Sequence, residues 1–315
     1  MATAAGLTAL LSRYGTVSVV GIAKNVGKTT TLNHLIEGFG REGLCLGLTG
    51  IGRDGESVDV VTGTAKPRIF VRAGTIVATA ADLLVFCDIT KEILAVTDIG
   101  TPMGGVVIVR ALSDGFVQLG GASITSQVAG ITALMRGFGA EKTIVDGAVD
   151  RRALANVTES AVLCAGASLR GDMDSVVSET AHVVGMMTLP QADISPDVFA
   201  VEPLDKNERI VRIDEGTICL RGAVTDGVVE GLGTELEGVR LVAEDPGKIF
   251  VRPAAYARLL RRKAALMVAR PANLVAVTVN PVSAYGGRFD AREFLDRMRG
   301  AVAVPVFDVM GEEGI

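Results

Sequence analysis

The sequence has no tryptophan, only 4% aromatic residues and two histidines in 315 residues. Catalytic triads and catalytic zinc sites use histidine as a base or as a ligand. Because His34 and His182 lie far apart in the chain, neither kind of site is expected. Hydrophobic residues nevertheless make up 49% of the chain. The core is therefore expected to be aliphatic, which suits buried parallel strands.

Long apolar runs and clustered cysteines are also missing. No uninterrupted apolar run reaches the roughly 18 residues that a membrane span needs, and the opening segment MATAAGLTALLSRYG lacks the basic start of a signal peptide. The four cysteines have no metal-ligand spacing: Cys45, Cys87, Cys164 and Cys219. We expect free thiols, mostly buried, in a cytoplasmic protein.

The charge balance is slightly acidic, with a net charge of −5 and a pI of about 5.3. A nucleic-acid binder would carry a basic patch with interleaved aromatic residues. The one basic group, at positions 258–263, is typical of a solvated helix face. Neither a nucleic acid nor a membrane is expected as a partner.

Residues 21–30, GIAKNVGKTT, are the most informative stretch. They follow the β-branched run 17–20 and precede apolar residues at helical spacing in 32–39. A strand, a glycine-containing turn and Lys-Thr at a helix start form the phosphate loop of P-loop proteins. Gly27, Lys28 and Thr29 fit the expected roles of loop glycine, phosphate-binding lysine and Mg²⁺-binding hydroxyl. The residues expected to contact the nucleotide are Lys24, Asn25, Val26, Gly27, Lys28, Thr29 and Thr30.

The loop departs from the strict P-loop pattern in one position. That pattern places glycine five residues before Gly27, where Ile22 stands, and Gly21 lies one residue earlier. The strand and helix on either side must therefore support the interpretation. The alternatives are a glycine-rich turn that binds nothing and, for Lys24, a solvent-facing lysine.

Hydrolysis also needs carboxylates that hold Mg²⁺ and orient water. Asp146 ends a hydrophobic strand, which is the position of a Walker B aspartate, and Asp54 follows the strand next to the loop helix. We predict Lys28, Asp54 and Asp146 as catalytic residues, and Thr29, Asp54 and Asp146 as metal ligands. The weaker candidates are Glu56, Asp59, Asp88 and Asp98. For every aspartate the alternative is a turn or a helix cap.

Base recognition has a weaker signal. The NKxD or TKxD tetrapeptide of guanine-specific sites does not occur, and Asn280 after the strand 274–279 is the nearest candidate reader. An Asn amide can donate to and accept from an adenine edge. The absence of a guanine-specific tetrapeptide favours ATP as the nucleotide and leaves GTP open. A turn residue before Pro281 is an equally good interpretation of Asn280.

The order of elements predicts an α/β P-loop NTPase fold with a mainly parallel sheet flanked by helices. We predict a single domain, 1–315, with a core of about 15–64, 141–187 and 270–310 and β-rich insertions at about 65–140 and 188–269. No internal repeat is evident. A strand at Leu83–Cys87 and a helix at Ala254–Ala269 are among the expected elements.

The order of strand, phosphate loop, acid and Walker B strand resembles the dimerising P-loop class. That class includes MinD-like ATPases, MobB-like molybdopterin-guanine dinucleotide accessory proteins and dethiobiotin synthetase. A closer resemblance rests on four blocks: GIAKNVGKTTTLN, TGIGRDGESVD, ITKEILAVTDIGTPMGGVVIVRALSDG and IVDGAVDR. They are similar to the P-loop subunit of the lysine 5,6-aminomutase reactivase, in lysine degradation.

This resemblance implies an ATPase that opens an aminomutase dependent on adenosylcobalamin and pyridoxal phosphate and expels damaged cobalamin. It also implies a MutS-like ATPase subunit as a partner, and the wider class implies a homodimer. Gly27, Lys28, Thr29 and Thr30 carry over directly, and Asp54 and Asp146 carry over by position. Two alternatives remain: a small-molecule kinase or ligase of the dethiobiotin synthetase type, and a scaffold that binds nucleotide without hydrolysis.

Overall fold

The computed structural model describes residues 4–52, 68–147, 158–200 and 209–309. Contacts within the chain divide it into two compact units. Unit 1 comprises residues 1–181 and 274–315, and unit 2 comprises residues 182–273. The predicted insertion at 188–269 falls within unit 2.

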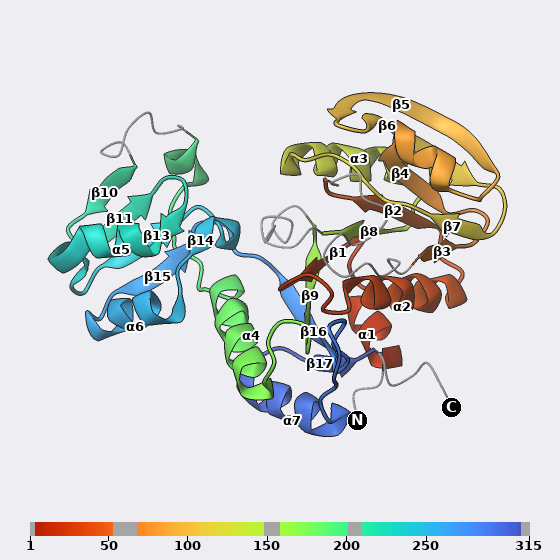
Figure 1. Cartoon of the computed structure of the whole chain (residues 1–315). Coiled ribbons are helices and arrows are strands. Elements are labelled where there is room, and N and C mark those ends of the chain that lie inside the picture. The colour runs from red at the N-terminus through yellow and green to blue at the C-terminus, as the bar shows by residue number, and fades with distance from the viewer. Residues whose placement is uncertain (1–3, 53–67, 148–157, 201–208, 310–315) are drawn as a thin grey trace. The chain divides into compact units, whose positions relative to one another are not determined.

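Unit 1 is built on a sheet that has nine strands in the described residues (Figure 1). Their order across the sheet is β17 (Val306–Asp308), β16 (Leu274–Asn280), β9 (Ser160–Gly166), β1 (Thr16–Gly21), β8 (Lys142–Asp146), β2 (Leu46–Gly50), β4 (Ile76–Ala80), β6 (Gly104–Ala111) and β5 (Lys91–Thr101). The strands from β17 to β4 are parallel, whereas β6 and β5 add an antiparallel hairpin. The range 65–140 therefore supplies three strands to the same sheet as β1.

Helices cover both faces of this sheet. The helices of unit 1 are α1 (Ala4–Leu11), α2 (Lys28–Arg41), α3 (Thr125–Gly137), α4 (Met173–Met187, which runs across the boundary at 181/182) and α7 (Ala291–Ala301). Helices α1 and α2 pack on one face and α3 packs on the other. Strand β8 illustrates the alternation, because Ile144 joins the core under α2 and Val145 the core under α3. The expected class, α/β with a mainly parallel sheet and flanking helices, is confirmed.

A buried lysine links the amino-terminal edge of the sheet to the end of α1. Lys142 at the start of β8 is 2% exposed, and its Nζ donates to the carbonyls of Leu11 (3.0 Å), Ser12 (2.9 Å) and Tyr14. These carbonyls follow the last turn of α1, where backbone acceptors lack helical partners. Burial lowers the pKa of Lys142. The N-terminal helix, which the sequence did not predict, is thereby joined to the centre of the sheet.

Unit 2 contains a second α/β arrangement. Its sheet has four strands in the described residues, in the order β10 (Ile210–Asp214), β11 (Thr217–Leu220), β13 (Arg240–Ala243) and β15 (Ala265–Val268). The last three are parallel, and β10 is antiparallel to β11. Unit 2 also contains two short strands and two helices: β12 (Val224–Thr225), α5 (Asp226–Leu232), β14 (Ile249–Phe250) and α6 (Pro253–Arg261).

These elements repeat the same order twice: strand, short strand, helix. The first copy is β11, β12 and α5, the second is β13, β14 and α6, and the short strands β12 and β14 pair with each other. The sequence alone did not reveal this repeat, because the two copies share a hydrophobic pattern and not residue identities.

Short elements complete the two units. They are β3 (Ile69–Val71) and β7 (Gly115–Val117), which pair in unit 1, and the 3₁₀ helices η1 (Ala81–Phe86), η3 (Pro196–Phe199), η4 (Gly233–Leu236) and η5 (Pro246–Lys248). Within the described ranges, no helix is both long and apolar enough to cross a bilayer.

Two predicted elements are wrong. The expected strand at Leu83–Cys87 lies largely in the 3₁₀ helix η1, in which Leu83 is buried while Val85 and Phe86 are exposed. The expected helix at Ala254–Ala269 ends at Arg261, and residues 265–268 form β15. Pairing of β15 with β13 buries Leu266 and Val268, so tertiary burial overrides the helical propensity of this segment.

Candidate functional site

The phosphate loop predicted at 21–30 connects β1 to α2 at the carboxyl-terminal edge of the sheet. The six strand residues of β1 are all buried, and α2 begins at Lys28. Between them, Asn25 (φ 60°) and Gly27 (φ 92°) have left-handed backbone conformations. Alternation of left- and right-handed residues turns successive N–H groups toward one side, which makes an anion-binding concavity.

The N-cap position of α2 has no side-chain cap. Gly27 is the N-cap residue and provides no side-chain hydrogen bond, and the first turn contains no acidic residue. The N–H of Thr31 donates to the Gly27 carbonyl at 3.0 Å, which is the first helical bond. The N–H groups of Lys28, Thr29 and Thr30 precede that bond and lie at the positive end of the helix dipole. This arrangement favours an anion such as phosphate.

Neighbouring strand ends hold the loop closely. A Cβ added to Gly27 would lie 2.8 Å from Cβ of Asn280, at the end of β16. A Cβ added to Gly166, at the end of β9, would lie 3.0 Å from the Val26 carbonyl. Glycine is thus required at 27 both for its positive φ and for this close approach.

Asn280 packs against the phosphate loop and also forms a turn. Its Oδ1 accepts a hydrogen bond from the Val282 N–H at 3.0 Å, and its side-chain Nδ2 lies beside Gly27. The amide oxygen therefore serves the turn that the sequence offered as the alternative to base recognition.

Lys28 and Asp146 meet although they are 118 positions apart. Nζ of Lys28 lies 2.5 Å from Oδ1 of Asp146, and the side chains are 22% and 20% exposed. The contact follows from topology: β8 is hydrogen-bonded to β1 in parallel, so that Asp146 pairs with Val19 near the end of β1. The structure thus brings together the loop lysine and the Walker B candidate.

A buried polar network lies beneath the loop. The hydroxyls of Thr31 and Thr278 are 2.9 Å apart, and the Cys164 thiol donates to the Thr31 hydroxyl at 3.4 Å. Burial raises the pKa of Cys164, so this thiol stays protonated at neutral pH. The four cysteines are free, as expected, and Cys45 alone is partly exposed.

The other sequence candidates lie elsewhere. Asp54, Glu56 and Asp59 lie outside the described residues. Asp88 accepts from the Phe116 N–H and pairs with Arg68 at 3.2 Å, which is a structural role at the start of the β5–β6 region. Asp98 is exposed on the edge strand β5. Lys24 is exposed in the loop, as its alternative interpretation expected.

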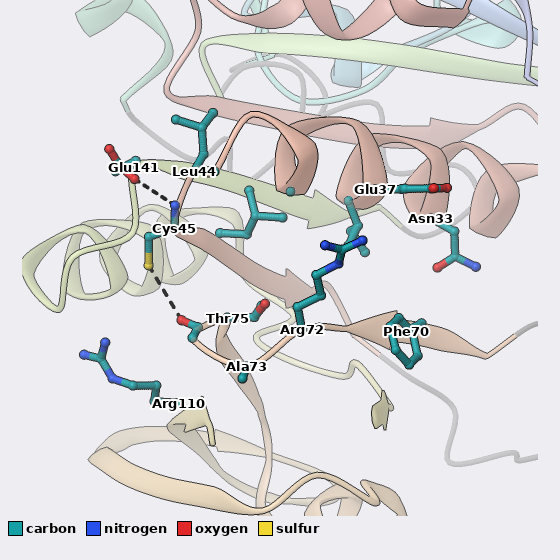
Figure 2. Close-up of a pocket in the computed structure, with 15 residues that line it drawn as sticks. Asn33, Glu37, Leu44, Cys45, Phe70, Arg72, Ala73, Thr75, Arg110 and Glu141 are labelled. Atoms are coloured by element: carbon teal, nitrogen blue, oxygen red, sulfur yellow. Dashed lines mark hydrogen bonds between the residues drawn. The ribbon is translucent and has the colours of Figure 1, made fainter. Parts of the chain in front are cut away.

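A second concavity lies at the opposite edge of the sheet, and sequence reasoning named none of its residues as functional. This pocket of about 670 Å³ is lined by the second half of α2, the amino-terminal end of β2, residues 70–75, Arg110 and Glu141 (Figure 2). The Cys45 N–H donates to Glu141 at 2.7 Å, and the Cys45 thiol lies 3.7 Å from the Gly74 carbonyl. Burial raises the pKa of this thiol, which makes it a poor nucleophile. The pocket mixes two arginines with two glutamates and is separate from the phosphate loop.

A scan against protein-family models finds no match for this chain, and searches of curated proteins and of solved structures find none either.

Proposed function

We propose that unit 1 binds a nucleoside triphosphate with Mg²⁺, ATP before GTP, at the phosphate loop and hydrolyses it. The observation that carries this proposal is the 2.5 Å contact between Lys28 and Asp146 at the start of an uncapped helix. A lysine and an acid at this position, next to a left-handed glycine, are the groups that a Mg²⁺–triphosphate needs. The P-loop NTPase fold is part of this proposal.

The residues at hand fit Mg²⁺ as well as phosphate. Mg²⁺ prefers oxygen donors and is usually held by one or two carboxylates together with substrate phosphates. The Thr29 hydroxyl and the Asp146 carboxylate would hold it here, and Mg²⁺ would supply charge neutralisation at the phosphates. Among the described residues, no group of three or more His, Cys, Asp or Glu side chains could hold a metal ion.

Each residue of the loop then has a distinct task. The N–H groups at the start of α2 hold the phosphate oxygens, and Lys28 exchanges its contact with Asp146 for the β- and γ-phosphates. Asp146, released from Lys28, becomes available to the metal. Asp54 remains the proposed residue for orienting water.

For the cellular role, we propose a reactivating ATPase that acts on an adenosylcobalamin-dependent aminomutase. The support is the resemblance of the four sequence blocks to the reactivase subunit. To shift a two-state conformational equilibrium of the protein from 1:99 to 99:1, a nucleotide must bind one state more tightly than the other by about 5.5 kcal/mol. Contacts of the γ-phosphate with Lys28 and Asp146 would contribute to this difference, and release of phosphate would reverse it.

Calorimetry with Mg²⁺-ATP tests the nucleotide site. Lys28→Ala removes a charged hydrogen bond worth about 1.5–3 kcal/mol, so affinity should fall about 10- to 150-fold. Lys248→Ala in unit 2 is the control and should bind ATP normally. Unchanged binding by Lys28→Ala would contradict the proposal.

Measurements of the ATPase rate test the proposed role in reactivating an aminomutase. The ATPase rate should rise with an aminomutase holoenzyme that carries inactive cobalamin, and released cobalamin should appear in parallel. Turnover only on addition of a small metabolite would instead support the kinase or ligase alternative. A stable ATP complex without phosphate release would support the non-hydrolysing scaffold.

A further inference from the structure

The segment 281–289, which follows β16, forms a closed loop beside the phosphate loop. The Ser283 N–H donates to the Gly287 carbonyl at 3.1 Å, and Val282 and Arg288 form an antiparallel bridge. The Ala284 N–H donates to the Ser168 hydroxyl at 2.9 Å, which ties the loop to the residues after β9. The loop is therefore held in place at the same sheet edge as Gly27.

The topology decides on which side a nucleoside would lie. Asp146 is on β8, on one side of β1, whereas β9 and β16 lie on the other side. If the γ-phosphate and metal are at Lys28 and Asp146, the rest of the nucleotide extends over the ends of β9 and β16. The loop 281–289 begins at that point.

Three side-chain oxygens in and beside this loop already accept hydrogen bonds within the protein. Asn280 Oδ1 accepts from Val282, the Ser283 hydroxyl accepts from the Tyr285 N–H at 3.2 Å, and the Ser168 hydroxyl accepts from Ala284. These bonds shape the loop and occupy the acceptor oxygens that could otherwise read a base edge.

The exposed side chains of the loop include one aromatic ring, one large aliphatic group and one cation, Arg288. Tyr285 is 56% exposed and Val282 is 45% exposed. The next two residues, Gly286 (φ 96°) and Gly287 (φ 86°), have no atom within 4 Å of an added Cβ, so the space beside these glycines is open. An exposed tyrosine on a constrained loop offers a flat face with little conformational entropy to lose.

We propose, resting on the function proposed above, that Tyr285 is the stacking platform for the nucleotide base. Stacking on an aromatic ring is tolerant of base identity, because every base has a π-face. This platform by itself discriminates little between bases, and the proposed preference for ATP over GTP rests on the missing NKxD or TKxD guanine reader. Asn280 then supports the phosphate loop and does not read the base.

The test compares Tyr285→Ala with Tyr285→Phe in the full chain, titrated with Mg²⁺-ATP, Mg²⁺-GTP and Mg²⁺-tripolyphosphate. Tyr285→Ala should weaken ATP and GTP binding about 5- to 30-fold and leave tripolyphosphate binding unchanged. Tyr285→Phe should keep the affinity for all three. If Tyr285→Ala binds ATP normally while Lys28→Ala does not, the stacking proposal is overturned and the nucleotide site stands. If the unmodified chain binds neither ATP nor tripolyphosphate, the nucleotide site itself is wrong.

A spectroscopic variant gives an independent readout. Because the chain has no tryptophan, Tyr285→Trp introduces a single reporter, and Phe86→Trp provides a control of similar exposure at 52% on η1. Emission of Tyr285→Trp should change with ATP and stay constant with tripolyphosphate, and Phe86→Trp should respond to neither. Equal responses of Tyr285→Trp to ATP and tripolyphosphate would overturn the proposal.

Discussion

Helices α2 and α7 of unit 1 start in opposite ways. At α7, the Asp290 carboxylate caps the helix by accepting the Glu293 N–H at 2.8 Å, and Glu293 adds a negative charge in the first turn. At α2, Gly27 offers no cap and the first charged residue is Lys28. Negative groups stabilise helix N-termini and positive groups do not.

In unit 2, helix α5 also begins with an acid, although its N-cap residue Thr225 makes no side-chain cap. Asp226 stands in the first turn of α5, and its carboxylate also accepts the N–H of Arg252, the N-cap of α6. The comparison teaches that α7 and α5 begin with acids of the chain, whereas the first charged residue of α2 is a lysine. Under the proposed function, a bound phosphate would supply the negative charge at the start of α2.

The largest expected effect comes from Gly27→Ala. The substitution forces a Cβ into the left-handed region and to 2.8 Å from Asn280, which should cost about 2–4 kcal/mol of stability. Urea unfolding measures the loss, and calorimetry should show loss of ATP binding. Gly40→Ala in the same helix is the control, because nothing lies within 4 Å of its added Cβ, and it should be neutral or slightly stabilising. Equal losses in the two variants would refute the special role of position 27.

Removing the cap of α7 should have a smaller effect and no functional one. Asp290→Ala should lower the free energy of unfolding by about 1 kcal/mol, because the Glu293 N–H loses its acceptor. Asp290→Asn keeps an acceptor and should recover most of the loss. Both variants should bind ATP as the unmodified chain does, and a change in ATP affinity would show that the two helix starts are not independent.

Converting α2 into a helix of the α7 type gives effects of opposite sign. Thr30→Glu places an acid in the first turn and should stabilise the protein by about 0.3–1 kcal/mol. The same charge should repel the triphosphate and weaken binding. Thermal unfolding and calorimetry measure the two effects, with Thr30→Gln as the uncharged control. Tighter ATP binding by Thr30→Glu would break the comparison.

Acid should remove the contribution of Asp226. Hydrogen bonds from the backbone and side chain of Arg252 lower its pKa below the ordinary value of 3.8. Its stabilising effect is therefore complete above pH 3.8 and is lost as the pH falls through the lowered value. Asp226→Asn should be less stable than the unmodified chain at pH 7, and the difference should shrink toward pH 3. A difference that stays constant with pH would contradict the assignment.

The sequence predicted the first βαβ unit well because its signals are local. The β-branched run 17–20 indicated β1 (Thr16–Gly21), and the apolar spacing in 32–39 indicated α2 (Lys28–Arg41). Asp146 was found because it ends an apolar strand. Its contact with Lys28 depends on the pairing of β1 with β8, and that pairing could not be predicted from the sequence.

What the sequence did not reveal depends on contacts between distant residues. Strand β15 has helical propensity and becomes a strand only because β13 supplies hydrogen bonds. The repeat in unit 2 lies in the order of elements and not in matching residues. The role of Asn280 against Gly27 depends on a close approach that no local pattern records.

Strand β8 connects two parts of unit 1 that appear unrelated in the sequence. Lys142 is anchored at one end in the carbonyls after α1, and Asp146 meets Lys28 at the other, about 13 Å away along four residues of extended chain. Deleting α1, or fusing a tag that displaces this helix, would leave the buried Lys142 ammonium without these carbonyl acceptors. Such changes would thus act through β8 on Asp146, the acid proposed to face the triphosphate, so protein that keeps the first helix intact is suited to nucleotide assays.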